Sequence, residues 1–434
     1  MKEDIEIKVD GKVLSRVVSG PDIAGVAQLL EGYSRVWMVY DANVASHAAK
    51  VAGVLKQETE RQAESINEKG MGEMAQTPNL VSTLAIETSE ESKNIETVLE
   101  IEKWLLETGA DRDALLLAVG GGITTDMAGF AASIYKRGIR FAFIPTTLLS
   151  QVDAAIGGKT GVNFESLKNM IGVIRQPDFT YICPDVLATL PAREFRSGAA
   201  EMLKTFIIED GGNYEKAVKL LSEIAGASIS DINTNQSTVK ACMSIPGSGT
   251  KQSSGESDMG TSDLNAKLPA GEVKTSMPDI NANQPAGQAC SNISAHQQEL
   301  QELIAAAAAV KAGIVSRDQF ENGERRKLNL GHTFAHAIEW KARETGSDIT
   351  HGEAVAIGMI QAAKLTDSAL AAKLKADFTK AGLPTELPFP LEDLAAAMLK
   401  DKKAEGGKVH FVLIRTIGDV YTEDMTVAEA ISRL

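Results

Sequence analysis

Three short apolar runs in the first 185 residues constrain the fold more than any other feature of the chain. They are Arg35–Tyr40, Ala114–Val119 and Phe141–Ile144, and each stops at Asp, Gly or Pro. Continuous apolar strands of this length are typical of a parallel sheet that is covered on both faces. The helical stretch Lys93–Thr108 lies among them, so we predict βαβ units and an α/β domain over residues 1–185.

The composition and the pattern of apolar residues change after residue 185. Ala-, Leu- and Glu-rich stretches such as Glu299–Val315 dominate, and strand-like runs are scarce until Val409–Ile414. We therefore predict a second, mainly helical domain over residues 186–434, with one large α/β domain as the alternative. Residues 228–297 contain no Phe, Tyr or Trp. We expect a flexible insertion there, because such a segment buries too little apolar surface to offset its ordering entropy.

Composition excludes several classes of protein. The chain has 44 Lys and Arg against 58 Asp and Glu, a net charge of −14. That balance argues against nucleic-acid or anionic-membrane binding, because both need a basic face. Three scattered cysteines (Cys183, Cys242 and Cys290) provide neither a disulfide framework nor a Cys-rich zinc site. The start of the chain lacks an apolar signal segment, and no apolar run reaches membrane-spanning length. We expect a cytoplasmic protein.

A glycine turn follows the second apolar run. Gly120, Gly121 and Gly122 precede a plausible helix start. Glycines at such a place let the backbone approach a pyrophosphate, and a helix N-terminus supplies N–H donors. The turn does not match the pattern G-x-G-x-x-G, so a nonstandard nucleotide loop and a plain tight turn both remain open.

A second glycine-rich segment, Gln151–Asn169, carries two lysines. Asp153 stands where a P-loop requires its first glycine, so that interpretation fails. What remains is a glycine-flexed loop that presents Lys159 and Lys168, with Asn169 beside the second lysine. In an acidic protein this arrangement favours a local anion site. Solvated surface lysines are the alternative.

The histidines are unevenly distributed, since three of the six fall between positions 332 and 351. On a helix, His332 and His336 share one face. The sequence Thr-His-Gly-Glu around His351 is typical of a capping box, and the helix dipole there disfavours an imidazolium. Neutral imidazoles with one carboxylate suit a catalytic zinc with an open coordination position. Spacing alone does not identify the carboxylate; Glu201 is a candidate, because Lys204 shares its helical face.

In order and spacing, these motifs resemble the 3-dehydroquinate synthase family of the sugar-phosphate cyclase superfamily. The resemblance covers nearly the whole chain apart from the expected insertion. The segments that carry it are Gly120–Phe130, Pro145–Leu149, Gln151–Asn169, Leu190–Lys204, Leu328–Phe334, His351–Glu353 and Asp401–Lys403. It implies a Rossmann-like N-terminal domain that binds NAD and a helical C-terminal domain that binds metal and substrate.

The resemblance also implies roles for individual residues. The ligands of a Zn²⁺ or Co²⁺ ion would be Glu201, His332 and His351. A phosphorylated sugar acid would be surrounded by Arg137, Asp153, Lys159, Lys168, Asn169, Lys204, Lys311, Arg325, Asn329, His336 and one of Lys402 and Lys403. NAD would be contacted by Asp41, Thr88, Ser89, Glu90, Glu91, Ser92, Lys93, Gly121, Gly122, Ile123, Thr124, Thr125, Asp126, Thr146, Thr147, Lys159, Lys168, Val186, Leu187, Ala188 and Thr189. His336 would face the substrate phosphate, and Arg137 would reach the substrate of a neighbouring subunit, which implies a homodimer.

The activity implied by the resemblance is that of a phosphate-eliminating lyase of the shikimate pathway for aromatic amino acid biosynthesis. It converts 3-deoxy-D-arabino-heptulosonate 7-phosphate to 3-dehydroquinate and phosphate by transient NAD oxidation, phosphate elimination and aldol closure. The alternatives are another NAD- and zinc-dependent cyclase, acting for example on sedoheptulose 7-phosphate, and a metal-dependent polyol dehydrogenase. One departure is Thr125, where the family pattern has glycine. A β-branched residue does not easily adopt φ > 0, so we expect either a differently shaped cofactor turn or weaker NAD binding.

Overall fold

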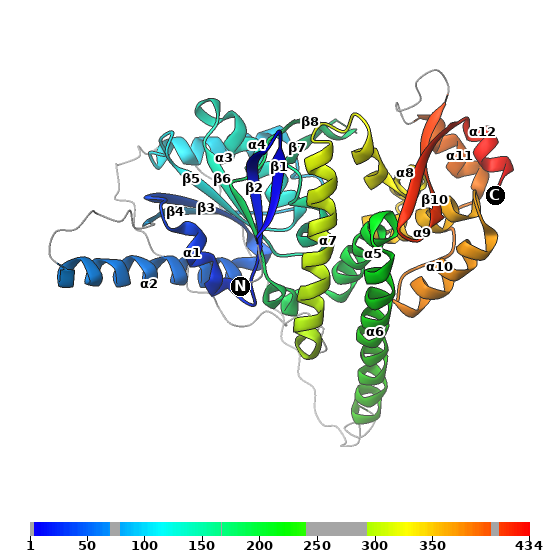
Figure 1. The fold of residues 1–434 in the computed structure, drawn as a ribbon, viewed down its shortest axis with the longest axis horizontal. Helices are drawn as coiled ribbons and strands as arrows, with labels where there is room; N and C mark the ends of the chain where they lie inside the picture. Colours follow the sequence, from blue (N-terminus) through cyan, green and yellow to red (C-terminus); the bar gives the residue numbers. More distant parts are fainter. Residues whose placement is uncertain (1–3, 70–78, 166, 240–292, 401–407) are drawn as a thin grey trace, which may run out of the picture. The chain divides into compact units, whose positions relative to one another are not determined.

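The computed structural model describes residues 4–69, 79–165, 167–239, 293–400 and 408–434 (Figure 1). Residues 1–228 and 287–434 together form one compact unit. Most of the expected insertion lies outside the described residues, as do Lys402 and Lys403. The first part of that insertion continues a helix that ends at Val239, and its last residues open the next helical segment at Ser294. None of the helices in the described ranges combines the length and apolarity that a membrane span requires.

A seven-stranded sheet organises the N-terminal part of the chain. In spatial order its strands are β1 (Ile5–Val9), β2 (Lys12–Ser19), β9 (Phe179–Ile182), β6 (Arg140–Pro145), β5 (Leu115–Gly120), β3 (Arg35–Asp41) and β4 (Asn79–Ile86). β1 and β2 are antiparallel, and every other neighbouring pair is parallel. The three apolar runs of the sequence are β3, β5 and β6. The predicted Rossmann-like α/β architecture is confirmed.

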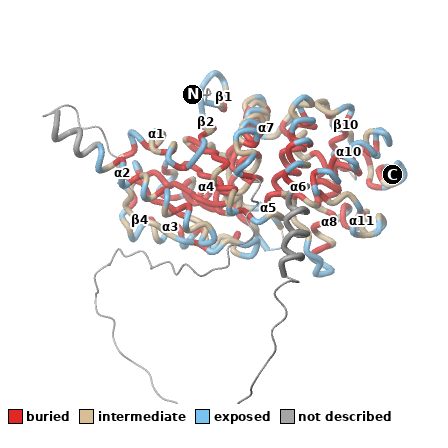
Figure 2. Tube along the Cα trace, turned by 90° about the horizontal axis from the view of Figure 1, so that it is seen from below, coloured by how far each residue is buried: buried red, intermediate tan, exposed pale blue. Residues whose placement is uncertain are grey.

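Side chains alternate between two apolar cores on the two faces of this sheet. In β5, Leu115 and Leu117 belong to one core, whereas Leu116 and Ala118 belong to the other. All residues of β5 are buried, which explains why its sequence is apolar without interruption. The helices α3 (Ile95–Glu107) and α4 (Gly122–Ile134) contribute to the second core, and the first core continues into the helical part. Buried residues accordingly line the strands and the inner faces of the helices (Figure 2).

The C-terminal part is mainly helical, as predicted. Its helices are α5 (Ala192–Glu209), α6 (Gly211–Val239), α7 (Gln297–Arg317), α8 (His332–Thr345), α9 (His351–Lys364), α10 (Ser368–Lys380), α11 (Leu391–Lys400) and α12 (Val427–Ser432). A two-stranded antiparallel ribbon, β10 (Val409–Thr416) and β11 (Asp419–Met425), accompanies them. Helix α7 packs against β1 and β2 and so joins the helices to the sheet (Figure 1).

Short helical turns complete the connections between these elements. The remaining elements are η1 (Ile23–Val26), α1 (Ala27–Leu30), η2 (Ala42–Val44), α2 (Ala45–Lys69), η3 (Tyr135–Arg137), η4 (Ser150–Ala154), η5 (Pro184–Thr189), η6 (Ser294–His296) and η7 (Glu324–Asn329). Of these, η4 is a single π-helical turn. Such turns often occur at functional sites.

The part of Gln151–Asn169 that carries Lys159 and Lys168 belongs to a β-hairpin, so the expected loop is wrong for both lysines. The strands β7 (Lys159–Phe164) and β8 (Leu167–Ile174) pair in antiparallel register, with Gly161 opposite Gly172. A Cβ at Gly161 would lie 2.4 Å from a backbone oxygen of the opposite strand, and one at Gly172 would lie 2.2 Å from such an oxygen. The two glycines therefore permit close approach of the strands rather than loop flexibility.

The expected distortion at Thr125 is also absent. Thr125 lies in the first turn of α4, where its N–H donates to the carbonyl of Gly121 and its hydroxyl donates to the carbonyl of Gly122. The residue has ordinary helical backbone geometry rather than a positive φ. A β-branched residue is compatible with that geometry, so the turn does not require glycine at this position.

Candidate active site and metal centre

Glu201, His332 and His351 meet from three different helices. Glu201 lies in the middle of α5, His332 is the first residue of α8, and His351 is the first residue of α9. One ligand atom of each residue lies within 4.8 Å of those of the other two. The centroids of the two imidazole rings are 5.2 Å apart.

Two glycines bring these helix ends together. Gly331 has φ 78°, a left-handed conformation that starts α8 directly at His332. Gly352 packs against α5 so closely that a Cβ would lie 2.0 Å from the carbonyl oxygen of Ser197. Its N–H also donates to the Ser197 hydroxyl at 3.0 Å. This close approach places His351 beside Glu201.

The predicted capping box at the start of α9 is present. The Thr350 hydroxyl accepts from the Glu353 N–H, and the Glu353 carboxylate accepts from the Thr350 N–H at 2.8 Å. Burial lowers the pKa of His351, but the contacts with Glu201 and Glu339 outweigh burial and raise the pKa to about 10. Two carboxylates beside one imidazole make the site attractive to a cation, and a metal ion bound at Nε2 would take the place of the proton there.

Each histidine of the cluster uses the same nitrogen, Nδ1, to contact an oxygen outside the cluster. The Nδ1–H of His332 donates to the Leu330 carbonyl at 3.1 Å, and the Nδ1–H of His351 donates to Glu339 Oε1 at 3.3 Å. Carbonyl and carboxylate oxygens only accept, so Nε2 of each ring carries the lone pair for a metal. The Nε2 of His351 lies 3.4 Å from Glu201 Oε1. Burial, reinforced by the charge of Lys204, holds the pKa of His332 well below its ordinary value.

The carboxylate of Glu201 fits the role of a metal ligand. The residue is 1% exposed, and neither side-chain oxygen has a hydrogen-bond partner among the described residues. Its contacts are ion pairs with Lys204 and His351. An ionised carboxylate has about four lone-pair positions, so these two ion pairs leave positions free for a metal ion. One carboxylate and two imidazoles are a donor set typical of zinc with an open coordination position.

A second group of similar composition lies elsewhere on the surface. Glu223, His296 and Glu299 also place their ligand atoms within 4.8 Å of one another. The side chain of Glu299 is 67% exposed and that of Glu223 is 43% exposed. Water can solvate both carboxylates, so nothing in this geometry calls for a metal ion.

Two buried lysines and an aspartate lie next to the Glu201 cluster. Asp153 in η4 accepts from Lys204 of α5 at 2.7 Å and from Lys311 of α7, which also donates to the Asp153 carbonyl at 2.6 Å. Burial raises the pKa of Asp153, but Lys204 and Lys311 together hold it well below the ordinary value. Burial lowers the pKa of Lys311. The two lysines of this network are balanced by two carboxylates, those of Asp153 and Glu201.

The predicted substrate residues Lys159 and Asn329 both contact Glu321, which sequence reasoning missed. Glu321 has a positive φ of 62° and accepts from Lys159 Nζ and, at 2.8 Å, from Asn329 Nδ2. Arg325, almost fully buried, donates to the carbonyl of Gly157 at 2.9 Å. The side chain of Lys159 is 48% exposed and forms an ion pair with Glu321. Neither periodicity nor spacing in the sequence marks Glu321.

The predicted site residue Lys168 contacts Glu339, a second residue that sequence reasoning missed. Lys168 Nζ lies 3.2 Å from Glu339 Oε1 and 3.5 Å from Glu90 Oε1. Burial raises the pKa of Glu339, but His351 and Lys168 outweigh burial and lower it to about 2. A signal was available, because Glu339 follows His332 by seven positions and therefore lies on the same face of α8.

Apart from Lys159 and Lys168, which lie in the hairpin, the predicted cofactor residues lie at or after the carboxyl ends of five parallel strands. Asp41 ends β3, residues 88–93 follow β4, residues 121–126 follow β5, residues 146–147 follow β6, and residues 186–189 follow β9. The carboxyl ends of parallel strands lie at one edge of the sheet, which is where open α/β sheets bind dinucleotides. The Thr88 hydroxyl donates to the Asp41 carboxylate at 2.6 Å.

The glycine turn between β5 and α4 has the features of an anion-binding turn. Gly121 is the N-cap of α4, and no side chain caps the helix there. A Cβ at Gly121 would lie 3.1 Å from the Thr147 side chain. The buried hydroxyls of Thr124 and Thr146 have no hydrogen-bond partner among the described residues. Of the two alternatives that the sequence left open, these features favour the nucleotide loop.

Lys93 connects the cofactor edge to the hairpin. Its ammonium group donates to Asp126 Oδ2 in α4 and to Asn169 Oδ1 in β8, both at 2.6 Å. Lys93 is buried. Burial raises the pKa of Asp126, and the charge of Lys93 lowers it by less than burial raises it. Two predicted cofactor residues and one predicted substrate residue thus form one polar chain.

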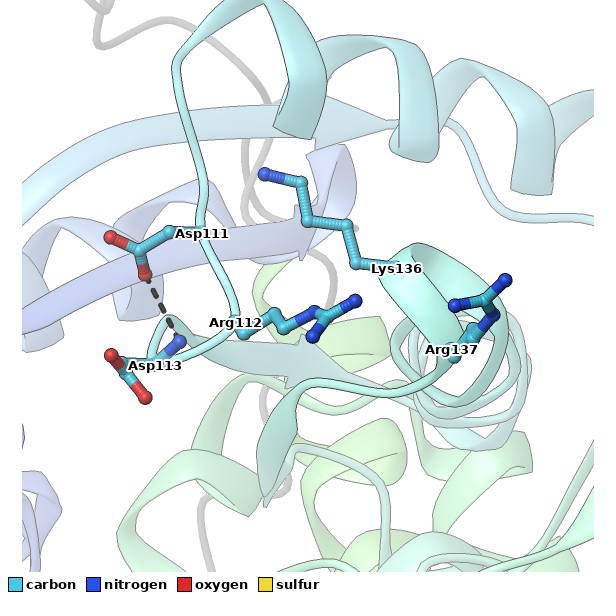
Figure 3. A pocket seen from close by; sticks show the side chains of 5 residues that line it. All are labelled: Asp111, Arg112, Asp113, Lys136 and Arg137. Carbon is cyan, nitrogen blue, oxygen red and sulfur yellow. Dashed lines mark hydrogen bonds between the residues drawn. The ribbon is translucent and has the colours of Figure 1, made fainter.

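The remaining predicted residues are placed differently. The ring of His336 lies next to that of His332, with the centroids 5.6 Å apart. Arg137 lies apart, in a surface pocket of about 630 Å³ whose other lining residues are Asp111, Arg112, Asp113 and Lys136 (Figure 3). Within the described part of the chain, this pocket shares no other lining residue with the predicted site. A single chain therefore does not bring Arg137 to the other predicted residues.

The fold and the site together define a class: an α/β enzyme with a dinucleotide-type sheet edge and a helical part that carries candidate metal ligands. An open sheet with a dinucleotide-type edge adjoins helices that carry a buried Glu-His-His cluster and buried lysines. Two family models match the chain. Residues 83–197 match the model described as 3-dehydroquinate synthase N-terminal, and residues 279–404 match the one described as 3-dehydroquinate synthase C-terminal.

Curated relatives agree with these matches. The 3-dehydroquinate synthase of Caulobacter vibrioides is 34% identical over 422 residues, which are 93% of this chain and 90% of the relative. That of Pyrococcus abyssi is 35% identical over 351 residues, or 80% of this chain and 82% of the relative. The chain belongs to the 3-dehydroquinate synthase family.

A solved structure is similar in fold to this chain. It is 2-epi-5-epi-valiolone synthase from Streptomyces hygroscopicus subsp. jinggangensis 5008 with NAD⁺ and Zn²⁺ bound. The sequence identity is 26% and the TM-score is 0.68, with 97% of this chain and 96% of that chain covered.

Proposed function

We propose that this protein is a 3-dehydroquinate synthase that converts 3-deoxy-D-arabino-heptulosonate 7-phosphate to 3-dehydroquinate and phosphate. Family membership supports the reaction class. The single observation that carries the proposal is the convergence of Glu201, His332 and His351 beside the buried cations Lys204 and Lys311. A carboxylate-bearing sugar phosphate needs a metal centre and fixed cationic side chains, and these residues would supply both.

The proposed cofactors are NAD and a divalent metal, Zn²⁺ or Co²⁺. The solved valiolone synthase with NAD⁺ and Zn²⁺ bound supports this proposal. Glu201, His332 and His351 would hold the metal, and the strand ends with the Gly121–Asp126 turn would hold NAD. When bound, these groups supply reversible oxidation of a substrate hydroxyl and polarisation of its oxygen.

The protein's own side chains would hold and orient the substrate. Lys159 and Asn329 share the carboxylate of Glu321, so an incoming substrate anion would compete with Glu321 for both. His336, beside the metal cluster, would face the phosphate. Asp153 fixes the ammonium groups of Lys204 and Lys311, so their positions require little reorganisation when substrate binds.

We also propose that the protein is a cytoplasmic homodimer. Arg137 supports this part of the proposal, because it lies in a surface pocket away from the other predicted residues. In a dimer, Arg137 would reach the substrate of the partner subunit.

The test supplies the heptulosonate phosphate with NAD⁺ and Zn²⁺ and follows phosphate release and absorbance at 340 nm together. We expect phosphate to be released at every turnover without accumulation of NADH, because the reduced cofactor is reoxidised within the cycle. Faster phosphate release from sedoheptulose 7-phosphate would identify another cyclase. A steady rise at 340 nm with simple polyols, without phosphate release, would identify a polyol dehydrogenase.

A further inference from the structure

Glu339 is a buried acidic residue that the proposed chemistry does not use. It lies in α8, is 7% exposed, and is seven positions after His332 on the same helix. Its Oε1 accepts from His351 Nδ1 at 3.3 Å and from Lys168 Nζ at 3.2 Å. A buried carboxylate with two such partners has a defined position, because displacing it would leave its charge unpaired.

The contact with His351 fixes the orientation of that imidazole ring. His351 is the first residue of α9 and its ring has only two nitrogens. With Nδ1 donating to Glu339, the other nitrogen, Nε2, is directed toward Glu201 at 3.4 Å. Without this acceptor, rotation of the ring would direct Nε2 away from the cluster.

The two histidines of the cluster are held by different means. His332 donates to the carbonyl of Leu330, two residues earlier in the same segment. His351 donates to a charged group on a different helix. The orientation of His351 therefore depends on a residue that is distant in sequence. A carboxylate partner also raises the basicity of a ligating imidazole more than a neutral carbonyl does.

Lys168 in turn holds Glu339. It approaches from β8, a strand of the hairpin, and also lies near Glu90, which follows β4. The contacts form a chain from Lys168 through Glu339 and His351 to Glu201. A change at Lys168 would therefore reach the metal ligands through Glu339.

We propose that Glu339, held by Lys168, is a positioning residue that orients His351 for metal binding. The inference rests on the proposed role of His351 as a metal ligand. It assigns Glu339 no contact with substrate or cofactor. A carboxylate that donates no atom to the metal still controls which nitrogen of the ring the metal meets.

The test measures Co²⁺ affinity and the visible absorption spectrum of the Co²⁺ complex in chelator-treated protein without substrate. We expect Glu339→Ala to weaken Co²⁺ binding roughly 10–100-fold, the usual effect of losing such a partner, and to alter the spectrum. Glu339→Gln should weaken it less, because the amide oxygen still accepts from Nδ1. The matched control is Glu344→Gln, which makes the same change on the same helix at a residue that pairs with Lys341. The control should bind Co²⁺ like the unaltered protein.

A second arm tests the part played by Lys168. If Lys168 acts through Glu339, Lys168→Met should weaken Co²⁺ binding by a smaller factor, and the double variant should bind no more weakly than Glu339→Ala alone. Additive losses in the double variant would contradict that relay.

Several outcomes would overturn the inference. Tight Co²⁺ binding and an unchanged spectrum in Glu339→Ala would show that Glu339 does not orient His351. If Glu339→Ala fails to fold, Glu339→Gln decides, because it preserves size and the acceptor; an affinity and spectrum identical to the unaltered protein would overturn the role of the charge. If Co²⁺ affinity falls as expected but the protein releases no phosphate from the heptulosonate phosphate, only the proposed function fails. Absence of Co²⁺ binding before any substitution would overturn both.

Discussion

The cofactor edge of the sheet and the metal side of the proposed site present different chemical groups. At the cofactor edge, short segments follow directly after strands and present glycine backbone, hydroxyl groups and the N-terminus of α4. On the metal side, charged side chains from α5, η4 and α7 are buried against one another, as in the contacts of Lys204 with Glu201 and Asp153. The cofactor edge presents mainly backbone and hydroxyl groups, whereas the metal side presents mainly charged side chains.

This difference predicts how each region responds to substitution. A binding surface made of backbone groups survives most side-chain changes. A buried charge cluster does not, because removing one partner leaves the others unpaired and desolvated. We therefore expect large effects on the metal side, small effects at the cofactor edge, and almost none in the exposed group Glu223, His296 and Glu299.

The largest effect is expected at a metal ligand. His332→Ala should weaken metal binding by more than the roughly 100-fold that marks loss of a supporting partner, and the purified protein should retain little metal. Metal analysis after dialysis measures this. The matched control is His296→Ala in the exposed group, which should retain the full metal content. Full occupancy in the His332 variant would contradict the comparison.

The next effect concerns stability. Lys204→Met leaves Glu201 and Asp153 without their shared cation, and loss of one partner from a buried pair costs about 3–5 kcal/mol. Urea unfolding of the metal-free protein should show this loss. Lys219→Met, which removes an exposed ion pair with Glu223, should change the free energy of unfolding by less than about 0.5 kcal/mol. Equal shifts in the two variants would show that buried charge is not the distinguishing feature.

A smaller effect is expected at the cofactor turn. Because Thr125 is helical, Thr125→Gly should be less stable than Thr125→Ala by about 1 kcal/mol, the difference in helix propensity between the two residues. Thermal unfolding of the two variants measures the sign. Neither substitution should tighten NAD⁺ binding. A glycine variant more stable than the alanine variant would indicate that the position needs a positive φ.

The smallest effect is a pH dependence at His47, next to the cofactor edge, where Nε2 contacts the Thr189 hydroxyl at 2.8 Å. Burial, with the charge of Lys50, lowers the pKa of His47 from 6.5. The unfolded chain therefore binds this proton more readily, so the contribution of His47 to stability is present above pH 6.5 and is lost as the pH falls below that value. The loss amounts to at most ~0.7 kcal/mol between pH 7 and pH 6. His47→Gln should flatten urea-unfolding stability over this range; an unchanged slope would contradict the assignment.

The sequence predicts the two regions unequally well. The strands around the cofactor edge can be predicted from the sequence, because β3, β5 and β6 are buried on both faces and their central residues are therefore apolar. The capping box at His351 is readable because it is local. The β7–β8 hairpin was not predicted, because Gly161 and Gly172 serve close packing across strands and resemble loop glycines in sequence.

The charge network was only partly predictable for a different reason. Its contacts depend on how helices pack, for example on the approach of Gly352 to Ser197, and a sequence contains no such distances. The two carboxylates that contact His351, those of Glu201 and Glu339, lie on other helices. Glu321 gave no signal. Glu339 gave one, because it shares a helical face with His332.

The most direct test of this account locates the metal in a crystal of the protein by anomalous diffraction at the zinc or cobalt absorption edge. The account predicts a single strong peak bounded by a carboxylate oxygen of Glu201 and the Nε2 atoms of His332 and His351. A peak at Glu223, His296 and Glu299 instead, or none between the three buried side chains, would contradict it.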